Sequence, residues 1–172
     1  MKKKNVLALL LLALAVLPSA AQKFALVDME YILKNIPAYE RANEQLNQVS
    51  KKWESEVEVL LNEAEALYKK YQSESVFLSD TQKTKAEEAI MAKEKEASDL
   101  KKKYFGSEGE LYKKRQSLLA PIQDEIYNAV KDICDQKGYQ LVLDRASGGS
   151  IIYASPKIDI SEEVLLKLGY TH

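Results

Sequence analysis

Histidine and cysteine are nearly absent from this sequence of 172 residues, which contains one of each, His172 and Cys134. Nucleophilic or metal-assisted catalysis usually needs a positioned base or a cluster of ligands, and these two residues supply neither. A single cysteine also excludes a disulfide bond within the chain. Because Cys134 lies next to Ile133, we favour a small buried hydrophobic role over a reactive or intermolecular thiol. We therefore expect no enzyme activity, no metal and no cofactor.

Glycine and proline are also scarce, with six and four residues, whereas Ala, Glu, Lys, Leu and Gln dominate the middle of the chain. This composition is typical of long, solvated helices. An excess of positive charge is missing as well, because 25 basic residues face 26 acidic ones. Duplex nucleic acid requires a basic face that displaces counterions, so the sequence argues against a nucleic-acid partner.

The main apolar run of the sequence lies at residues 6–17. It follows a cluster of lysines and precedes the small residues Ser19 and Ala21, which is the order of a secretory signal peptide. A helix needs roughly 20 apolar residues to cross a bilayer, so this run is too short for a permanent anchor. We expect residues 1–21 to be removed after Ala21, leaving an exported protein without a membrane span. Transient contact with a membrane surface stays open.

The remaining chain is predicted to begin with a buried strand over residues 23–28 and a short helix over residues 29–35. Pro37 fixes φ and lacks an N–H, so it should break the chain before a long helix over residues 39–77. Apolar residues recur along this helix with a mean step near 3.6 residues, which indicates a coiled-coil arm with little supercoil. Its predicted seam contains Ala42, Leu46, Val49, Trp53, Val57, Leu60, Ala64, Leu67 and Tyr71.

The apolar pattern lapses at Val76, Phe77 and Leu78, which should be exposed at the tip of a helical hairpin. Ser79 is a suitable N-cap for a returning helix of similar length. Pro121 removes one backbone hydrogen bond, so it should interrupt and kink this helix and divide the arm from a body. The predicted seam of the returning helix contains Ala86, Ile90, Ala97, Leu100, Tyr104, Leu111, Leu118, Ile122, Ile126, Ala129 and Ile133.

Gly106 and Gly109 lie within the predicted returning helix. Each glycine costs about 1 kcal/mol relative to alanine inside a helix, so we expect a flexible point there. Together with Pro121, they are the candidate hinge residues.

The C-terminal part of the sequence contains two short β-favouring runs, at residues 139–144 and 151–154, which we expect to form a hairpin. A short helix over residues 161–168 should begin at a Ser161 cap and end at Gly169. Three short strands would leave two open sheet edges, so association between chains is the expected remedy.

Three segments carry a resemblance to a known family: FALVDMEYILKNIP, LLAPIQDEIYNAVKDICDQKGYQLVLD and IIYASPKIDISEEVLLKLGY. With these segments in this order, the sequence resembles the Skp/OmpH family of periplasmic chaperones over the whole chain after the signal peptide. The resemblance implies a homotrimer in which strands of three chains form a small β-barrel body, with helical hairpins as arms around a cavity. It also implies that unfolded outer-membrane β-barrel proteins, the clients, are held there without ATP.

The expected fold is α+β and mainly α, with a long antiparallel coiled-coil hairpin projecting from the small β-body. The expected domains are the signal peptide (1–21), the body (22–39 and 121–172) and the arm (40–120). One feature departs from the familiar enterobacterial members, whose arms are markedly basic: residues 40–137 hold 17 basic and 20 acidic residues. Electrostatic capture of acidic clients or of lipopolysaccharide is therefore not carried over from the family.

Apolar doublets on the arm are the candidate client-binding residues. Neighbours on a helix point about 100° apart, so one member fills a narrow seam while the other faces elsewhere. A wider seam, or contact near the body, is the alternative explanation. The candidates, with the predicted tip, are Leu61, Tyr68, Val76, Phe77, Leu78, Met91, Phe105 and Tyr112. A non-enzymatic coiled-coil scaffold of the envelope that binds one folded partner is the alternative function.

Overall fold

The computed structural model describes residues 23–147, 149 and 151–170. The predicted signal peptide, its cleavage after Ala21 and the single histidine lie outside these residues. The elements follow in the order β1 (Lys23–Val27), α2 (Met29–Lys34), α3 (Pro37–Glu74), η1 (Ser75–Phe77), α4 (Asp80–Phe105), α5 (Glu110–Lys137), β2 (Tyr139–Asp144), η2 (Pro156–Ile158) and α6 (Ser161–Lys167).

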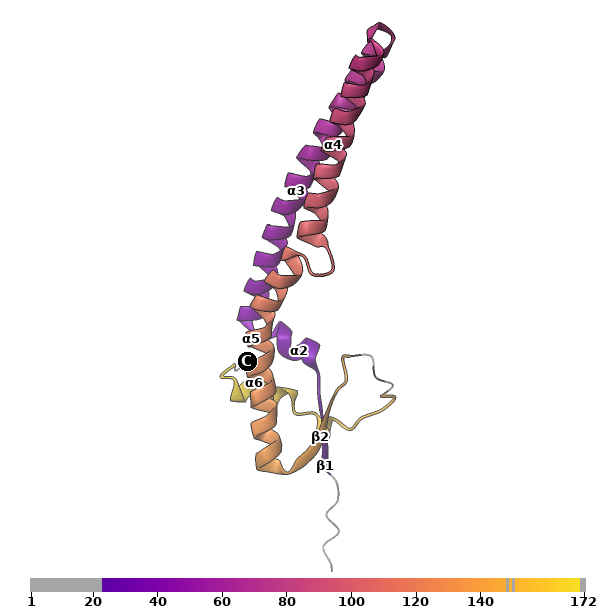
Figure 1. Ribbon diagram of the computed structural model, residues 1–172. Helices are drawn as coiled ribbons and strands as arrows, with labels where there is room; N and C mark the ends of the chain where they lie inside the picture. Colours follow the sequence, from indigo (N-terminus) through magenta and orange to yellow (C-terminus); the bar gives the residue numbers. More distant parts are fainter. Residues whose placement is uncertain (1–22, 148, 150, 171–172) are drawn as a thin grey trace, which may run out of the picture.

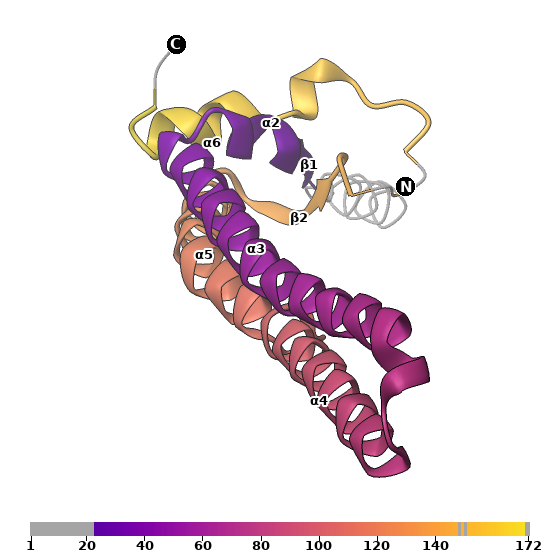
Figure 2. The same cartoon turned by 90° about the horizontal axis from the view of Figure 1, so that it is seen from above.

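A long helical arm projects from a small body, as the sequence predicts (Figure 1). With 38 residues at 1.5 Å each, α3 is about 57 Å long. The chain then turns at η1 and returns as α4 and α5, which both lie along α3 when the molecule is viewed from above (Figure 2). Because α5 continues past the start of α3, it belongs to both the arm and the body.

The tip of the arm forms at the predicted place. Ser79 is the N-cap of α4, and it forms a capping box with Gln82. The backbone N–H of Ser79 donates to Gln82 Oε1 at 2.9 Å. The reciprocal bonds satisfy backbone groups that the start of a helix leaves unpaired, so they fix the point at which α4 begins. At the other end of α3, Pro37 is the first helical residue rather than a break before the helix, because that position needs no N–H.

The returning helix is interrupted at residues 106–109 and not at Pro121, which corrects the prediction. Pro121 lies inside α5, and the helix continues on both sides of it. A proline removes only one backbone hydrogen bond, and neighbouring turns hold the helix together here. At the real interruption the chain leaves α4 after Phe105, and Gly109 caps the start of α5.

The sheet of the body has two parallel strands, with Phe24 opposite Leu141 and Leu26 opposite Leu143. Parallel strands need a long crossover, and the whole arm supplies it. The predicted hairpin is wrong, because none of the described residues at 151–155 forms a strand. The chain instead returns to the far side of β1, where the Ile160 N–H donates to the Leu26 carbonyl at 2.9 Å.

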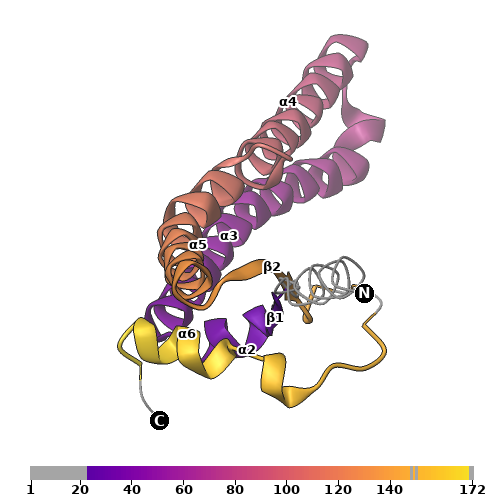
Figure 3. The same cartoon turned by 90° about the horizontal axis from the view of Figure 1, so that it is seen from below.

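The hydrophobic core of the body lies between the sheet, α5 and the two short helices. Viewed from below, α2 and α6 lie side by side next to α5, with the strands beside them (Figure 3). The inner face of β1 and the predicted seam of α5 meet there. The most deeply buried members of this core are Ala25, Ile32, Ile126, Ile133, Val164 and Leu165.

A polar network ties the two strands to the start of α6. The Asp28 carboxylate caps α2 by accepting from the Tyr31 N–H at 2.8 Å, and it pairs with Arg145 at 2.9 Å. Arg145 also reaches Asp159 at 3.2 Å. Ser161 is the first residue of α6 rather than its cap, because Ile160 occupies that position. The Ser161 hydroxyl accepts from the Asp28 N–H at 2.8 Å and donates to the Asp159 carboxylate at 2.6 Å.

This network predicts acid-sensitive stability. The hydrogen bond from the Tyr31 N–H, followed by Arg145, holds the pKa of Asp28 below its ordinary value of 3.8. A carboxylate with a lowered pKa contributes fully above the unfolded-state pKa, and the contribution is lost as the pH falls through the folded-state pKa. Asp28→Ala should therefore lower the free energy of unfolding by about 1–2 kcal/mol at pH 7. The difference from the parent should shrink well below pH 4.

Urea denaturation at pH 7 and at pH 3, at one protein concentration, measures this difference. Asp28→Asn is the matched control, because asparagine keeps the cap and removes only the charge. It should cost less than the alanine substitution. An alanine variant as stable as the parent at pH 7 would contradict the role of Asp28.

Candidate functional site

The seam of the arm follows the predicted series, and the second member of most doublets on α3 and α4 faces outward. Every predicted seam residue on α3 and α4 is buried or half-buried. The buried members are Ala42, Leu46, Val57 and Ala64 on α3, and Ile90 and Ala97 on α4. Small and aliphatic residues therefore form much of the seam, while Leu61 and Tyr68 beside it on α3 are exposed.

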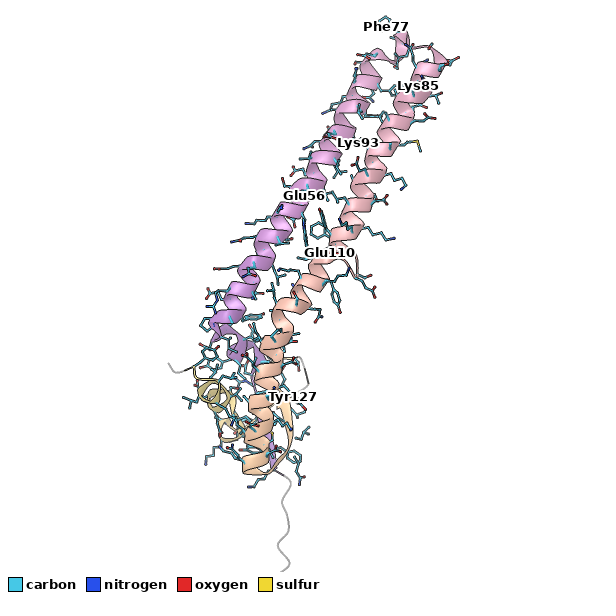
Figure 4. The ribbon with its side chains drawn as sticks, turned by 60° about the vertical axis from the view of Figure 1, so that its left-hand side comes forward. Glu56, Phe77, Lys85, Lys93, Glu110 and Tyr127 are labelled. Atoms are coloured by element: carbon cyan, nitrogen blue, oxygen red, sulfur yellow. The ribbon has the colours of Figure 1, made fainter. Side chains whose placement is uncertain are left out.

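Most of the candidate residues are exposed. Phe77 at the tip has 86% of its surface exposed, and Met91 on α4 has 68%. Figure 4 shows Phe77 at the far end of the arm. Leu78 and Phe105 are half-buried. The remaining exposed candidates are Leu61, Tyr68, Val76 and Tyr112.

The candidate client-binding residues on α3 and α4 lie on one side of the arm. At 100° per residue, Leu61 and Tyr68 are on the same side of the α3 seam. Leu61 and Phe105 line one groove between α3 and α4, which places Phe105 on that side of α4. Met91 and Phe105 are about 40° apart around α4 at 100° per residue, so Met91 is on this side as well. We call Leu61, Tyr68, Met91 and Phe105 the apolar side of the arm. Among the residues of α3 and α4, Val59 is the large hydrophobic residue exposed on the other side.

An aromatic cluster marks the point where the returning helix is interrupted. Trp53 and Tyr104 stack with ring centroids 4.7 Å apart, and Phe105 meets the Tyr104 ring edge-on at 6.3 Å. The Tyr104 hydroxyl donates to the Glu56 carboxylate, and this hydrogen bond raises the pKa of Tyr104. Stacking and hydrogen bonding therefore hold the end of α4 on α3, directly before the chain leaves the helix.

The body has an exposed apolar surface that the sequence reasoning missed. Phe24, Leu141 and Leu143 are exposed on the outer face of the sheet. Beside them, a groove of about 600 Å³ between β2 and α5 is lined by Tyr127, Cys134 and neighbouring residues. Tyr127 is 67% exposed and lies on the basal part of α5 (Figure 4). Ile126 and Tyr127 form another apolar doublet, and the reasoning used for the arm would have predicted that Tyr127 is exposed.

Cys134, which the sequence predicts to be buried, is half-buried in this groove. Burial raises the pKa of its thiol, so the thiol is protonated at neutral pH. Among the residues that the structure describes, no group of three metal-ligating side chains comes together. Within the same residues, no helix combines the length and hydrophobicity that crossing a membrane requires.

Comparison with known proteins gives a consistent result. The profile of the family described as outer membrane protein (OmpH-like) matches residues 23–168. The chain is 27% identical over 158 residues to the chaperone protein Skp of Pectobacterium atrosepticum, covering 91% of both proteins. It is 26% identical over 154 residues to the chaperone protein Skp of Photorhabdus laumondii, covering 90% of both.

A solved structure shares the fold. A crystal structure of a Caulobacter crescentus protein, described as an outer membrane chaperone (OmpH-like), superposes with a TM-score of 0.66. The superposition covers 87% of this chain and 85% of that one, at 13% sequence identity. This likeness confirms the predicted architecture of a long helical hairpin on a small body.

Proposed function

The chain belongs to the family of OmpH-like outer membrane proteins, and on that premise we propose that it is an ATP-independent holdase chaperone of the periplasm. Its clients are unfolded outer-membrane β-barrel proteins, held in a cavity between the arms of a trimer. The signal peptide expected at residues 1–21, with cleavage after Ala21, supports this location. No catalytic step is part of the proposal.

The observation that carries the proposal is the one-sided exposure of large apolar residues on the arm. Apolar contact contributes roughly 25 cal/mol per Å² removed from water. Partly exposed side chains such as Leu61, Tyr68 and Met91 each offer a few tens of Å² and therefore bind weakly alone. Several such contacts on one side of the arm give multivalent, reversible binding. This is what a chaperone for many unfolded sequences requires.

The direct test dilutes a urea-denatured outer-membrane β-barrel protein into buffer with the mature chaperone and without ATP. We expect light scattering from aggregation to be suppressed near one trimer per client. Several unrelated unfolded chains should be protected, and a folded soluble protein should not be bound. Unchanged aggregation in the presence of an excess of the protein would overturn the proposal.

The outer face of the body supports the proposed trimer. Exposed apolar residues on a two-stranded sheet with open edges are a liability in a monomer. The described apolar segment at 151–154 forms no strand, and Ile152 is 99% exposed. Three-fold closure would bury these surfaces and pair the open edges, which would also assemble the expected β-barrel.

The trimer predicts a definite mass in solution. Light scattering coupled to size exclusion, at micromolar concentration, should report about three times the mass of the mature chain. Dilution should lower the helical circular dichroism signal together with the mass. A separated chain would expose the apolar face of its sheet, which destabilises its fold. A well-folded monomer that persists at these concentrations would contradict the trimer.

The interruption at residues 106–109 supports a proposed hinge. Two helices, α4 and α5, pack separately on α3, so the distal arm can move relative to the basal arm when the aromatic cluster loosens. Gly106 and Gly109 have ordinary negative φ values, and close backbone approach is what requires glycine. A Cβ at Gly106 would lie 2.5 Å from the Lys102 carbonyl oxygen, and one at Gly109 would lie 2.7 Å from that of Tyr104.

These contacts change the expected effect of alanine at the glycines. In a continuous helix alanine would stiffen the arm, whereas here Gly109→Ala should force the loop to rearrange and destabilise the arm by about 1–3 kcal/mol. Hydrogen exchange over residues 103–112 should become faster. Ser107→Ala, in the same loop, is the matched control. Unchanged exchange in the Gly109 variant would show that the loop tolerates a Cβ and that close approach is not its constraint.

A further inference from the structure

The apolar side of the arm carries a groove between α3 and α4 with a volume of about 270 Å³. Its floor is apolar: Val57 is buried, Phe105 is half-buried, and Leu61 has 51% of its surface exposed. The rest of its lining is charged and comprises Glu54, Glu58 and Lys101. We call it the lateral groove.

Negative charge predominates at the rim of the lateral groove. Glu54 and Glu58 are one helical turn apart on α3, with Cβ atoms roughly 5–6 Å from each other. Glu54 accepts a hydrogen bond from the Ser50 hydroxyl at 2.9 Å. Within the described part of the chain, neither carboxylate forms an ion pair. Lys101 is the single cation among the lining residues.

The opposite side of the same hairpin differs in charge. A groove of about 510 Å³ runs there between α3 and α4. Its lining residues are Leu60, Ala92, Lys95, Glu96, Asp99, Leu100 and Lys103. Two lysines balance two carboxylates, and no aromatic ring contributes to the floor. The combination of an aromatic floor with an excess of negative charge therefore belongs to the apolar side.

We propose that the lateral groove selects unfolded segments in which an aliphatic or aromatic side chain stands next to lysine or arginine. This inference rests on the chaperone function proposed above and specifies its clients. The apolar side chain would cover Val57 and Leu61. The long stem of a basic side chain can lie against the Phe105 ring while its charged head reaches Glu54 and Glu58. A carboxylate in the same place is repelled by both glutamates.

The expected preference is moderate because the ion pairs are exposed to solvent. Exposed pairs each contribute little, and two of them give a basic segment about threefold to tenfold tighter binding than an acidic one. Salt at about 0.15 M screens charges over roughly 8 Å, so it should reduce the preference and leave the apolar contribution.

Three disordered peptides test the proposal. They share one pattern of alternating leucine and tyrosine, and the intervening positions are lysine, glutamate or serine. Fluorescence anisotropy with the mature protein measures each affinity at low and at physiological salt. The lysine peptide should bind about threefold to tenfold more tightly than the glutamate peptide at low salt, with the serine peptide between them.

Variants locate the effect. Glu54→Gln with Glu58→Gln should abolish the preference and leave the affinity for the serine peptide unchanged. Glu44→Gln with Glu88→Gln makes the same change in net charge at exposed positions outside the groove, and it should keep the preference. Equal binding of the lysine and glutamate peptides would overturn the inference, and so would an equal loss in both double variants.

The serine peptide separates this inference from the proposed function. If it binds and denatured β-barrel protein is protected, a missing charge preference overturns only the selectivity of the groove. If no peptide binds and denatured β-barrel protein aggregates as it does alone, the chaperone function fails and the selectivity falls with it.

Discussion

Serine at Leu61, Tyr68 and Met91 together should raise the concentration needed to protect an unfolded β-barrel protein by about tenfold or more. Each side chain is about half exposed or more, so its replacement costs the folded arm little. Each would lose a few tens of Å² of contact with a client, at roughly 25 cal/mol per Å², and the losses multiply in multivalent binding. Phe105 is left in place because its ring packs edge-on against Tyr104.

The measurement is suppression of light scattering after dilution of the denatured client, with circular dichroism as a check on helix content. Val59→Ser is the control, because Val59 is 53% exposed on the other side of the arm. Protection by the parent should change little between low and moderate salt, since residues 40–137 carry a small net charge. If moderate salt abolished protection and the triple variant protected like the parent, charge patches such as residues 101–103 would replace the apolar side as the binding surface.

Glutamate at Leu141 should dissociate the proposed trimer. Leu141 is exposed in the single chain, beside Phe24 on the outer face of the sheet, and the proposed barrel would bury it. Burial of an unpaired carboxylate in each of three subunits costs several kcal/mol per subunit, which exceeds what the association can absorb. The mass in solution should fall to that of one chain, and protection of clients should fall with it because the cavity is lost.

Ser147→Glu is the matched control for this substitution, since it adds the same charge in the exposed turn after β2. Its mass should remain that of the parent. A Leu141→Glu variant that keeps the parent mass would show that the outer face of the sheet is not the subunit interface.

The arm could be predicted from the sequence because its determinants are local. The 3.6-residue spacing from Ala42 to Tyr71 identifies the α3 seam, and Ser79 identifies the start of α4. The sequence predicts the break in the returning helix at Pro121 rather than at residues 106–109, because proline and glycine disturb a helix in different ways. Pro121 costs one hydrogen bond that a long helix tolerates, whereas Gly106 and Gly109 permit backbone contacts that exist only in the folded loop.

The sheet was less predictable because its pairing is not local. The apolar run at 151–154 has the composition of a strand, but strand formation needs a partner edge. In the single chain, hydrogen bonds from Arg145 and Ile160 to β1 fix the paths into and out of this segment. The candidate client-binding site was predictable in part. Doublets identified which residues face outward, and only the pairing of α3 with α4 shows that Leu61 and Phe105 share one side.

Photo-crosslinking from two neighbouring positions on α4 shows which side of the arm a bound client contacts. Met91 lies on the apolar side, and Ala92 lines the groove on the opposite side, about 100° away. A photoreactive amino acid at either position is exposed and changes the fold little. With a bound unfolded β-barrel protein, we expect strong crosslinking to the client from position 91 and weak crosslinking from position 92. Equal crosslinking from both positions, or stronger crosslinking from position 92, would contradict the claim that clients lie against the apolar side of the arm.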